Sequence, residues 1–293
     1  MRSMHSSIFS RIPIVVLTVV CVAGGGPNVY GQRINAKKMV EEMLAGRKTQ
    51  TPIPSLTQTY GSFSIERAYQ IQRSLARELT KELGGIAGYK VAYASKAAQK
   101  QFGMTEPASG PLFRLQRVPN GSKLPTSTFG ELTLETEIAF TIGKRIDRVI
   151  QDVAQIKNYV QWVHTAFDAG DYRFTADAAP NAQDMIASGV GAHVFVLGPA
   201  VCPSKVDVDA VRLKLIRNGH VLADSPATDV MGSPWNSLLW CANHIVELGG
   251  TLEPGAVIVT GTAAPAYKVK GGGIKGDYIG DCGPLGKVTM TLH

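Results

Sequence analysis

The segment from Leu134 to Ile142 alternates apolar and polar residues with a period of two, which is the pattern of a β-strand. In a strand, residues i and i+2 point to the same side. The apolar residues of this segment therefore share one face, and the carboxylates of Glu135 and Glu137 share the other. The strand rise places the Cα atoms of these two glutamates about 7 Å apart. The chain must therefore form a sheet that accommodates two neighbouring negative charges on one face.

Two environments can accommodate this pair of carboxylates. On a solvent-facing strand their repulsion costs little. Because E-x-E occurs often by chance, this is the simpler interpretation of the pair by itself. If the pair faces a cavity it needs a cation, and carboxylate oxygens suit Mg²⁺, Mn²⁺ or Ca²⁺. Asp168 is the next candidate ligand, but it lies in a run (164–173) that follows a predicted helix and by itself indicates a loop.

The rest of the chain alternates helices with short strands, which predicts an α+β fold. Helices are predicted over 34–46, 64–83, 95–102, 152–163 and 233–248. Strands are predicted over 86–93, 134–142, 192–197, 211–216, 221–222, 256–260, 267–269 and 285–292. The stretch 105–130 is rich in Pro, Gly and Ser and is predicted to be irregular. Residues 32–85 thus form a helical N-terminal portion, and residues 86–293 form an α+β body dominated by short strands.

The first 31 residues have the three regions of a secretory signal peptide. Arg2 and Arg11 provide positive charge without any acid, and residues 12–23 are almost entirely apolar. Glycines follow, and small residues near Gly31 predict cleavage before Gln32. The apolar core is too short for a comfortable membrane span. We therefore expect an exported protein, periplasmic or secreted. The alternative is a protein anchored to the membrane by an uncleaved signal.

Composition narrows the class of protein further. Of 293 residues, 44% are hydrophobic and 18% are charged, which argues against disordered, collagenous and coiled-coil chains. The net charge of +7 is scattered without a basic run, so no nucleic-acid partner is predicted, whereas a small anionic substrate suits it. Cleavage would leave three cysteines, Cys202, Cys241 and Cys282. Cys241 is expected to be buried, and pairing of Cys202 with Cys282 is left open.

Several motifs stand in an order and spacing typical of one enzyme family. They are Gly88-Tyr89-Lys90-Val91, the stretch from Ser95 to Pro107, Gly110-Pro111-Leu112-Phe113, the segment Leu134 to Phe140, Gly232-Ser233-Pro234-Trp235-Asn236 and the stretch from Leu252 to Gly261. On these motifs the chain resembles the 2-keto-4-pentenoate hydratases of the fumarylacetoacetate hydrolase superfamily. The resemblance covers roughly Ser64 to Leu292, and it implies an α+β fold with a rolled, mixed β core and a hydratase-like catalytic domain over residues 86–293.

The resemblance also implies a site and a reaction. It implies Mg²⁺ or Mn²⁺, held by Glu135, Glu137 and Asp168. It implies that Lys90, otherwise interpreted as a solvated lysine at a strand edge, transfers a proton or holds developing charge. The remaining implied residues, which contact the substrate, are Arg173, Thr260 and Gly261. The implied reaction is addition of water to a small 2-oxo acid through a metal-stabilised enolate. The family forms oligomers, so the resemblance implies a homo-oligomer.

One departure from the family pattern concerns the acid–base group. The hydratases usually read E-P-D-aromatic-G, whereas this chain reads Glu106-Pro107-Ala108-Ser109-Gly110, and Ala108 has no proton to give. The metal site is therefore expected to be retained while the substrate-handling part has changed. The alternatives are a related decarboxylase or C–C hydrolase of the same superfamily, and a secreted non-catalytic derivative that keeps the fold and the metal site.

Overall fold

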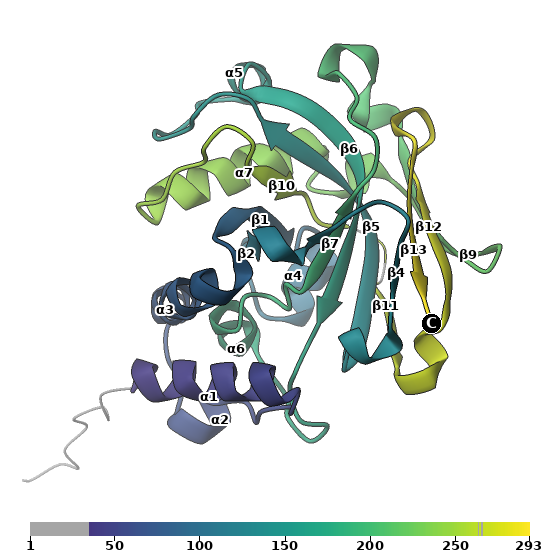
Figure 1. The fold of residues 1–293 in the computed structure, drawn as a ribbon. Coiled ribbons are helices and arrows are strands. Elements are labelled where there is room, and N and C mark those ends of the chain that lie inside the picture. Colours follow the sequence, from purple (N-terminus) through teal and green to yellow (C-terminus); the bar gives the residue numbers. More distant parts are fainter. Residues whose placement is uncertain (1–34, 263, 265) are drawn as a thin grey trace, which may run out of the picture. The chain divides into compact units, whose positions relative to one another are not determined.

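The computed structural model describes residues 35–262, 264 and 266–293, and these residues belong to one compact unit. The predicted signal peptide, with Cys21, lies outside the described residues. Within the described part, no helix is both long enough and apolar enough to cross a membrane. The elements that matter for the site are two β-sheets and the helices that pack against the larger one (Figure 1).

Four of the five predicted helices begin and end within three residues of their predicted bounds, and two short helices, over 56–60 and 182–187, were not predicted. Ser64 caps the longest of them through the N–H of Arg67, and Gly84 ends it in the left-handed conformation. Ser233, followed by Pro234, caps the last. The helices are α1 (Ala36–Thr49), α2 (Leu56–Tyr60), α3 (Ile65–Leu83), α4 (Lys96–Gln101), α5 (Val153–Lys157), α6 (Ala182–Ala187) and α7 (Pro234–Glu247).

The larger sheet has eight strands in the order β2-β1-β10-β5-β6-β7-β3, with β11 paired to β5 beside this path. It is mixed, because β1 runs parallel to β10 while β5 runs antiparallel to β6 and β10. Its strands are β1 (Ile86–Ala92), β2 (Ala108–Phe113), β3 (Arg117–Val118), β5 (Glu131–Ile142), β6 (Val160–Asp171), β7 (Val194–Leu197), β10 (Val257–Val259) and β11 (Tyr267–Lys270).

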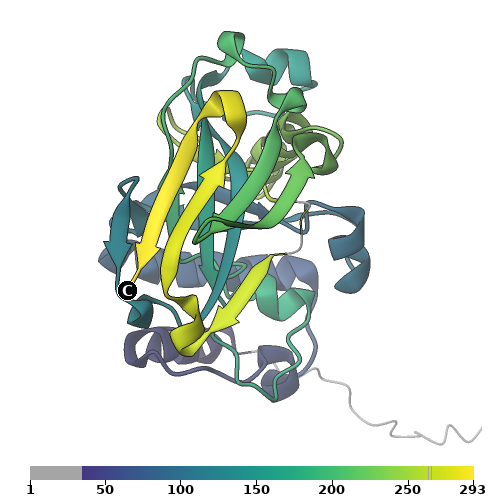
Figure 2. The same cartoon turned by 90° about the vertical axis from the view of Figure 1, so that its right-hand side faces the viewer.

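The smaller sheet packs face to face on the larger one, with β12 and β13 in yellow toward the viewer in Figure 2. Its order is β4-β13-β12-β8-β9. Phe167 of the larger sheet and Tyr278 of the smaller one share a buried apolar cluster. Gly280 permits this contact, because a Cβ there would lie 2.9 Å from the Phe167 ring. The strands are β4 (Ser122–Leu124), β8 (Arg212–Arg217), β9 (His220–Pro226), β12 (Gly276–Asp281) and β13 (Lys287–Leu292).

Helices also pack against the larger sheet in two apolar clusters. Helix α7 buries Trp235 and Leu238 against Phe140 of β5. Helices α1, α2, α3 and α6 gather beside β2 and form a second apolar cluster (Figure 1). The α+β fold with mixed sheets and a helical N-terminal portion is therefore confirmed.

Two local predictions were wrong. The predicted helix over 152–163 ends at Lys157, and β6 begins at Val160, because pairing along the whole of β5 outweighs the local helical pattern. The stretch 105–130, predicted to be irregular, contains the fully buried strand β2. Its Gly110 is required by packing, since a Cβ there would lie 2.4 Å from Val190. Its Pro111 is tolerated because β2 is an edge strand.

The cysteines are all free thiols in the described part of the chain, so Cys202 and Cys282 do not pair. Cys241 is completely buried within α7, as predicted, and burial raises the pKa of its thiol. Cys202 is partly exposed.

Candidate metal centre

Pairing of β5 with β6 brings the three predicted metal ligands together. Asp168 lies directly opposite Glu135 in the antiparallel register, and Glu137 lies two residues farther along the same face of β5. Each residue offers a carboxylate oxygen, and these oxygens all lie within 4.8 Å of one another. Asp168 is thus on a strand and not in the loop that its local sequence indicates, so the cluster is built on two long, rigid elements.

A break in strand pairing opens β5 beside the two glutamates. Strand β10 pairs with β5 at residues 139–141, and β11 pairs with it at residues 131–134, both on the same edge. Between these strands the chain leaves the sheet at Thr260, whose N–H still bonds to the Ile138 carbonyl. The next N–H, that of Gly261, donates to Glu137 Oε2. The break therefore leaves Glu135 without a paired strand on that edge, and the Gly261 N–H orients the carboxylate of Glu137.

The electrostatics of the cluster fit a divalent cation. Glu137 and Asp168 are 0% and 1% exposed, and within the described residues Glu137 Oε1 and Asp168 Oδ1 accept no hydrogen bond. Burial, and then the charges of Asp168 and Glu135, raise the pKa of Glu137 well above its ordinary value. Burial also raises the pKa of Glu135 to about 7. Burying an ionised carboxylate without a partner costs free energy. Mg²⁺ or Mn²⁺, which prefer oxygen ligands, would supply the missing partner.

Lys90 provides a positive charge beside this cluster. It lies on β1, is 2% exposed, and its ammonium pairs with Asp168 Oδ2. Burial would lower the pKa of Lys90, but the charges of Asp168, Tyr172, Glu135 and Glu137 raise it above its ordinary value. Lys90 is thus a buried ammonium beside the carboxylates, and not a solvated lysine at a strand edge.

A cavity of about 600 Å³ opens over this cluster, within the usual size range of small-molecule sites. Lys90 and Glu135 line it, together with alanines of β1 and α4 and of the segments 176–178 and 264–266. Short side chains leave room for a small organic acid. The carboxylate face of β5 is therefore turned toward a cavity, and the solvent-facing interpretation does not hold.

Three further polar side chains of the cavity were not predicted from the sequence. Tyr93 directly follows β1 in the left-handed conformation (φ 56°), and its hydroxyl is buried without a hydrogen-bond partner in the described residues. Tyr172 follows β6, and Lys268 of β11 lies over its ring, 5.8 Å from the centroid. The only sequence signal for Tyr172 was its place beside Asp171. Nothing local marked Tyr93 or Lys268, which reach the cavity through the fold.

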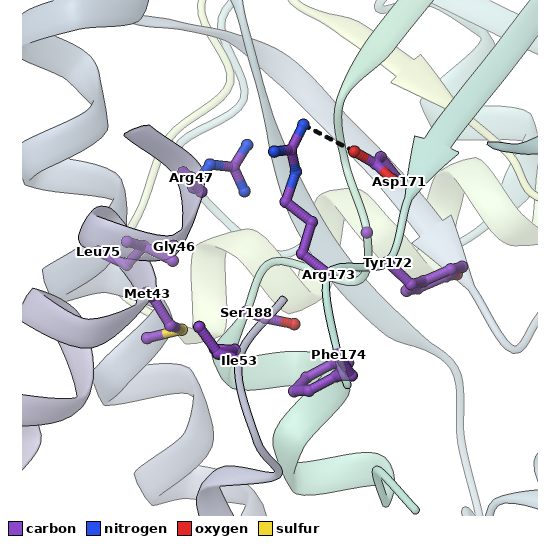
Figure 3. Close-up of a pocket in the computed structure, with 11 residues that line it drawn as sticks. Met43, Gly46, Arg47, Ile53, Leu75, Asp171, Tyr172, Arg173, Phe174 and Ser188 are labelled. Atoms are coloured by element: carbon purple, nitrogen blue, oxygen red, sulfur yellow. Dashed lines mark ion pairs between the residues drawn. The ribbon is translucent and has the colours of Figure 1, made fainter. Parts of the chain in front are cut away.

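The three residues predicted to contact substrate lie in three different environments. Gly261 lines the cavity. Thr260 is fully buried, and its hydroxyl donates to the Ile138 carbonyl at 2.9 Å, so its side chain holds β10 against β5. Arg173 pairs with Asp171 at 2.7 Å and lines a separate, smaller pocket (Figure 3). The structure thus brings Lys90, Glu135, Glu137, Asp168 and Gly261 together, and leaves the Thr260 and Arg173 side chains outside the cavity lining.

Replacing Gly261 by alanine should destabilise the site. Gly261 has φ 84°, and a Cβ there would lie 2.7 Å from the Cβ of Ala94. We expect a loss of about 2–4 kcal/mol in the free energy of unfolding, from backbone strain plus steric overlap, measured by urea denaturation. Gly255→Ala is the matched control, because Gly255 has φ 90° and open space at its Cβ position. Equal losses in both variants would mean that the contact with Ala94 is unimportant.

Comparison with known proteins agrees with this fold and with the family resemblance. Residues 86–283 match the C-terminal domain of the fumarylacetoacetate hydrolases. The 2-keto-4-pentenoate hydratase of Paraburkholderia xenovorans (strain LB400) is 27% identical over 252 residues, covering 85% of this chain and 91% of that protein. The 2-oxo-hept-4-ene-1,7-dioate hydratase of Escherichia coli is 27% identical over 262 residues, covering 87% of this chain and 96% of that protein.

Solved structures show the same fold at lower identity. The 4-oxalocrotonate decarboxylase from Pseudomonas putida G7, complexed with magnesium and adipate, gives a TM-score of 0.82 at 20% identity, over 89% of this chain and 98% of that one. The fumarylpyruvate hydrolase from Pseudomonas aeruginosa, in complex with Mn²⁺ and pyruvate, gives 0.52 at 18% identity, over 70% of this chain and 88% of that one. With a family match that spans more than half of its length, this chain belongs to the fumarylacetoacetate hydrolase family.

Proposed function

We propose that this protein is a metal-dependent lyase that adds water to a small unsaturated 2-oxo acid. The observation that carries the proposal is the cluster of three carboxylates beneath a cavity of about 600 Å³, in which Glu137 and Asp168 have buried oxygens without a hydrogen-bond partner among the described residues. Relatives that match most of the chain are hydratases of 2-oxo acids, and two neighbours in fold were solved with a divalent metal.

Glu135, Glu137 and Asp168 would hold the Mg²⁺ or Mn²⁺ ion. When bound, such an ion supplies Lewis acidity to the 2-oxo group, which favours the enolate form of the substrate. Glu137 is held in its orientation by the Gly261 N–H. Asp168 is held by its place opposite Glu135 and by Lys90. The carboxylates therefore need little reorganisation to receive the ion.

Lys90 would act on the substrate itself. Its ammonium lines the cavity next to Asp168, where it can donate a hydrogen bond to an oxygen that gains negative charge, or transfer a proton. Because the ammonium is buried, its interaction with such an oxygen is little screened by water. The hydroxyl of Tyr93 is a further donor to the cavity, and it has no hydrogen-bond partner among the described residues.

A thermal-shift titration of the purified protein tests this proposal. Mg²⁺ or Mn²⁺ should raise the melting temperature, and oxalate or pyruvate, as mimics of a 2-oxo acid, should raise it further in the presence of metal. Turnover of a panel of 2-oxo acids then identifies the reaction. A flat response to metal and mimic would contradict the proposal. A response to both without turnover would indicate the non-catalytic derivative.

Decarboxylation or C–C hydrolysis is the second candidate, and Ala108 favours it. Ala108 is buried on β2, directly opposite Ala92, which lines the cavity. Residues directly opposite in an antiparallel pair share a face, so an acid at 108 would be turned toward the cavity side. A chain without that acid would lack the group that the family resemblance implies for hydration, while the carboxylates proposed to hold the metal are present.

Restoring the acid separates these two reactions. If hydration is limited by Ala108 alone, Ala108→Asp should raise the hydration rate by on the order of 10²-fold, as expected for an acid–base group. Its burial should cost about 1–3 kcal/mol of stability. Ala108→Asn is the matched control without an ionisable proton. No gain over Ala108→Asn, together with release of CO₂ or cleavage of the carbon chain by the wild type, would favour the second candidate.

Two further proposals concern the export of the protein and its self-association. We propose that residues 1–31 direct export, either with cleavage before Gln32 or as an uncleaved membrane anchor, and that the mature protein is a homo-oligomer. Amino-terminal sequencing of the protein from its native cell tests the cleavage, and light scattering of the purified protein tests the assembly. An intact Met1 in a cytoplasmic fraction would contradict export.

A further inference from the structure

A second pocket lies on the other side of residues 172–174 from the cavity, and two arginines face each other in it (Figure 3). Arg47 comes from the last turn of α1, and Arg173 follows the end of β6. Tyr172 and Phe174 line both this pocket and the large cavity, so they form a shared wall. We call this pocket the arginine pocket.

The charges of the arginine pocket do not balance. Arg173 pairs with Asp171 Oδ2 at 2.7 Å, and Asp171 Oδ1 already accepts the N–H groups of Gly130 and Glu131. Within the part of the chain that the structure describes, no carboxylate forms an ion pair with Arg47. Its one hydrogen bond there is a 3.4 Å contact to the Ala192 carbonyl. Of the two guanidinium groups, only that of Arg173 is therefore paired with a carboxylate among the described residues.

The other ionisable groups near the pocket do not change this balance. Burial, and then the charge of Arg173, lower the pKa of Arg47 to about 10, which still leaves it protonated at neutral pH. Asp171 and the exposed Glu82 partly offset that decrease. Burial lowers the pKa of His193 to about 4, so this histidine is neutral and adds no charge. One positive charge therefore stays uncompensated in a largely buried place.

We propose that Arg47 and Arg173 bind a small inorganic anion of halide size. A partly buried cation without a counter-ion is costly, and an anion between two guanidinium groups would relieve both the desolvation and the repulsion. The pocket has a volume of about 30 Å³. One water needs roughly 10–15 Å³ by this measure, so the pocket has room for a chloride ion.

The bound anion would connect α1 to the wall of the large cavity. It would link the end of α1, through Arg47, with the segment that carries Arg173 and the shared wall residues Tyr172 and Phe174. Tyr172 already packs tightly on Gly191, which also lines the arginine pocket, since a Cβ at Gly191 would lie 2.5 Å from the Tyr172 ring. Anion binding is therefore expected to stabilise the protein in the absence of any divalent metal.

Thermal unfolding of the metal-free protein tests the site with chloride as the probe. At matched ionic strength, replacing sodium gluconate by sodium chloride at ten times its dissociation constant should raise the melting temperature by about 3–6 °C. Arg47→Gln should abolish this rise. Arg77→Gln, which removes an exposed arginine from α3, should keep it. Equal responses of the wild type and Arg47→Gln would overturn the proposal.

A crystal soaked in bromide provides the direct measurement. Anomalous scattering should show a bromide between the guanidinium groups of Arg47 and Arg173 in the wild type. If Arg47→Gln does not fold, Arg47→Lys keeps the charge and should retain weakened binding. A pocket without an anomalous peak would overturn the proposal. Because no divalent metal or 2-oxo acid is used, this result is independent of the proposed enzymatic function.

Discussion

Replacing Lys90 by methionine should lower turnover by on the order of 10²–10⁴-fold, the usual contribution of a positioned proton donor. Methionine matches the lysine stem in length and is compatible with a residue that is 2% exposed. It removes the ammonium that pairs with Asp168. The three carboxylates would then lack their neighbouring cation, so we expect Mg²⁺ binding to persist or to tighten while the reaction is lost. Steady-state kinetics and a metal titration on the same sample measure both effects.

The control for Lys90 is Lys100→Met, which removes an exposed lysine from α4 close to the same cavity. It should keep the wild-type rate. Turnover of Lys90→Met within a few-fold of the wild type would exclude a role for this ammonium in the reaction. Loss of metal binding would show instead that Lys90 maintains the geometry of Asp168.

Replacing Glu137 by glutamine should abolish stabilisation by metal. At a metal concentration 100 times the dissociation constant, the wild type should gain about 2.7 kcal/mol, or roughly 5–10 °C in melting temperature. Glutamine keeps the shape of the side chain, and its amide oxygen can still accept the Gly261 N–H. It removes a charged ligand from the cluster, so the rise should fall to near zero in a thermal-shift titration.

The metal-free Glu137→Gln protein should be at least as stable as the metal-free wild type. The folded-state pKa of Glu137 is raised, so its ionised form opposes folding, and that penalty grows as pH rises above the ordinary carboxyl pKa. The melting temperature of the metal-free wild type should therefore decrease from pH 5 to 8 more than that of the variant. Glu106→Gln, at an exposed position, should behave as wild type toward metal. A persistent metal response in Glu137→Gln would remove Glu137 from the ligand set.

The carboxylate strand shows what local pattern can predict. The period of two in residues 134–142 placed Glu135 and Glu137 on one face, and the structure confirms that Ile138 and Phe140 pack on the other. The same pattern could not decide whether the carboxylates face solvent. That depends on the break between β10 and β11, which lie more than 100 positions away, and on the cavity over it, which is lined by residues of β1, α4, β11 and the segment after β6.

The other partners in the cluster were harder to predict from sequence patterns alone. Asp168 lies in a segment whose local residues indicate a loop, and it becomes part of a strand because β6 pairs with β5 along its whole length. Lys90 reaches Asp168 from β1, which β10 separates from β5 in the sheet order. Family resemblance named both residues, but nothing in their local sequence indicated that they meet.

The sequence by itself determined many of the elements and the residues that they carry, because helix caps, strand alternation and turn residues act over only a few positions. It thus predicted α3 and α7, with Ser64 and Ser233 at their starts, and the shared face of Glu135 and Glu137. Only the tertiary structure decided which distant side chains share a buried space. Lys90 pairs with Asp168, and Arg47 lies opposite Arg173, only in the folded chain. Burying these charged groups costs free energy only after the chain has folded around them, so no local pattern indicates these contacts.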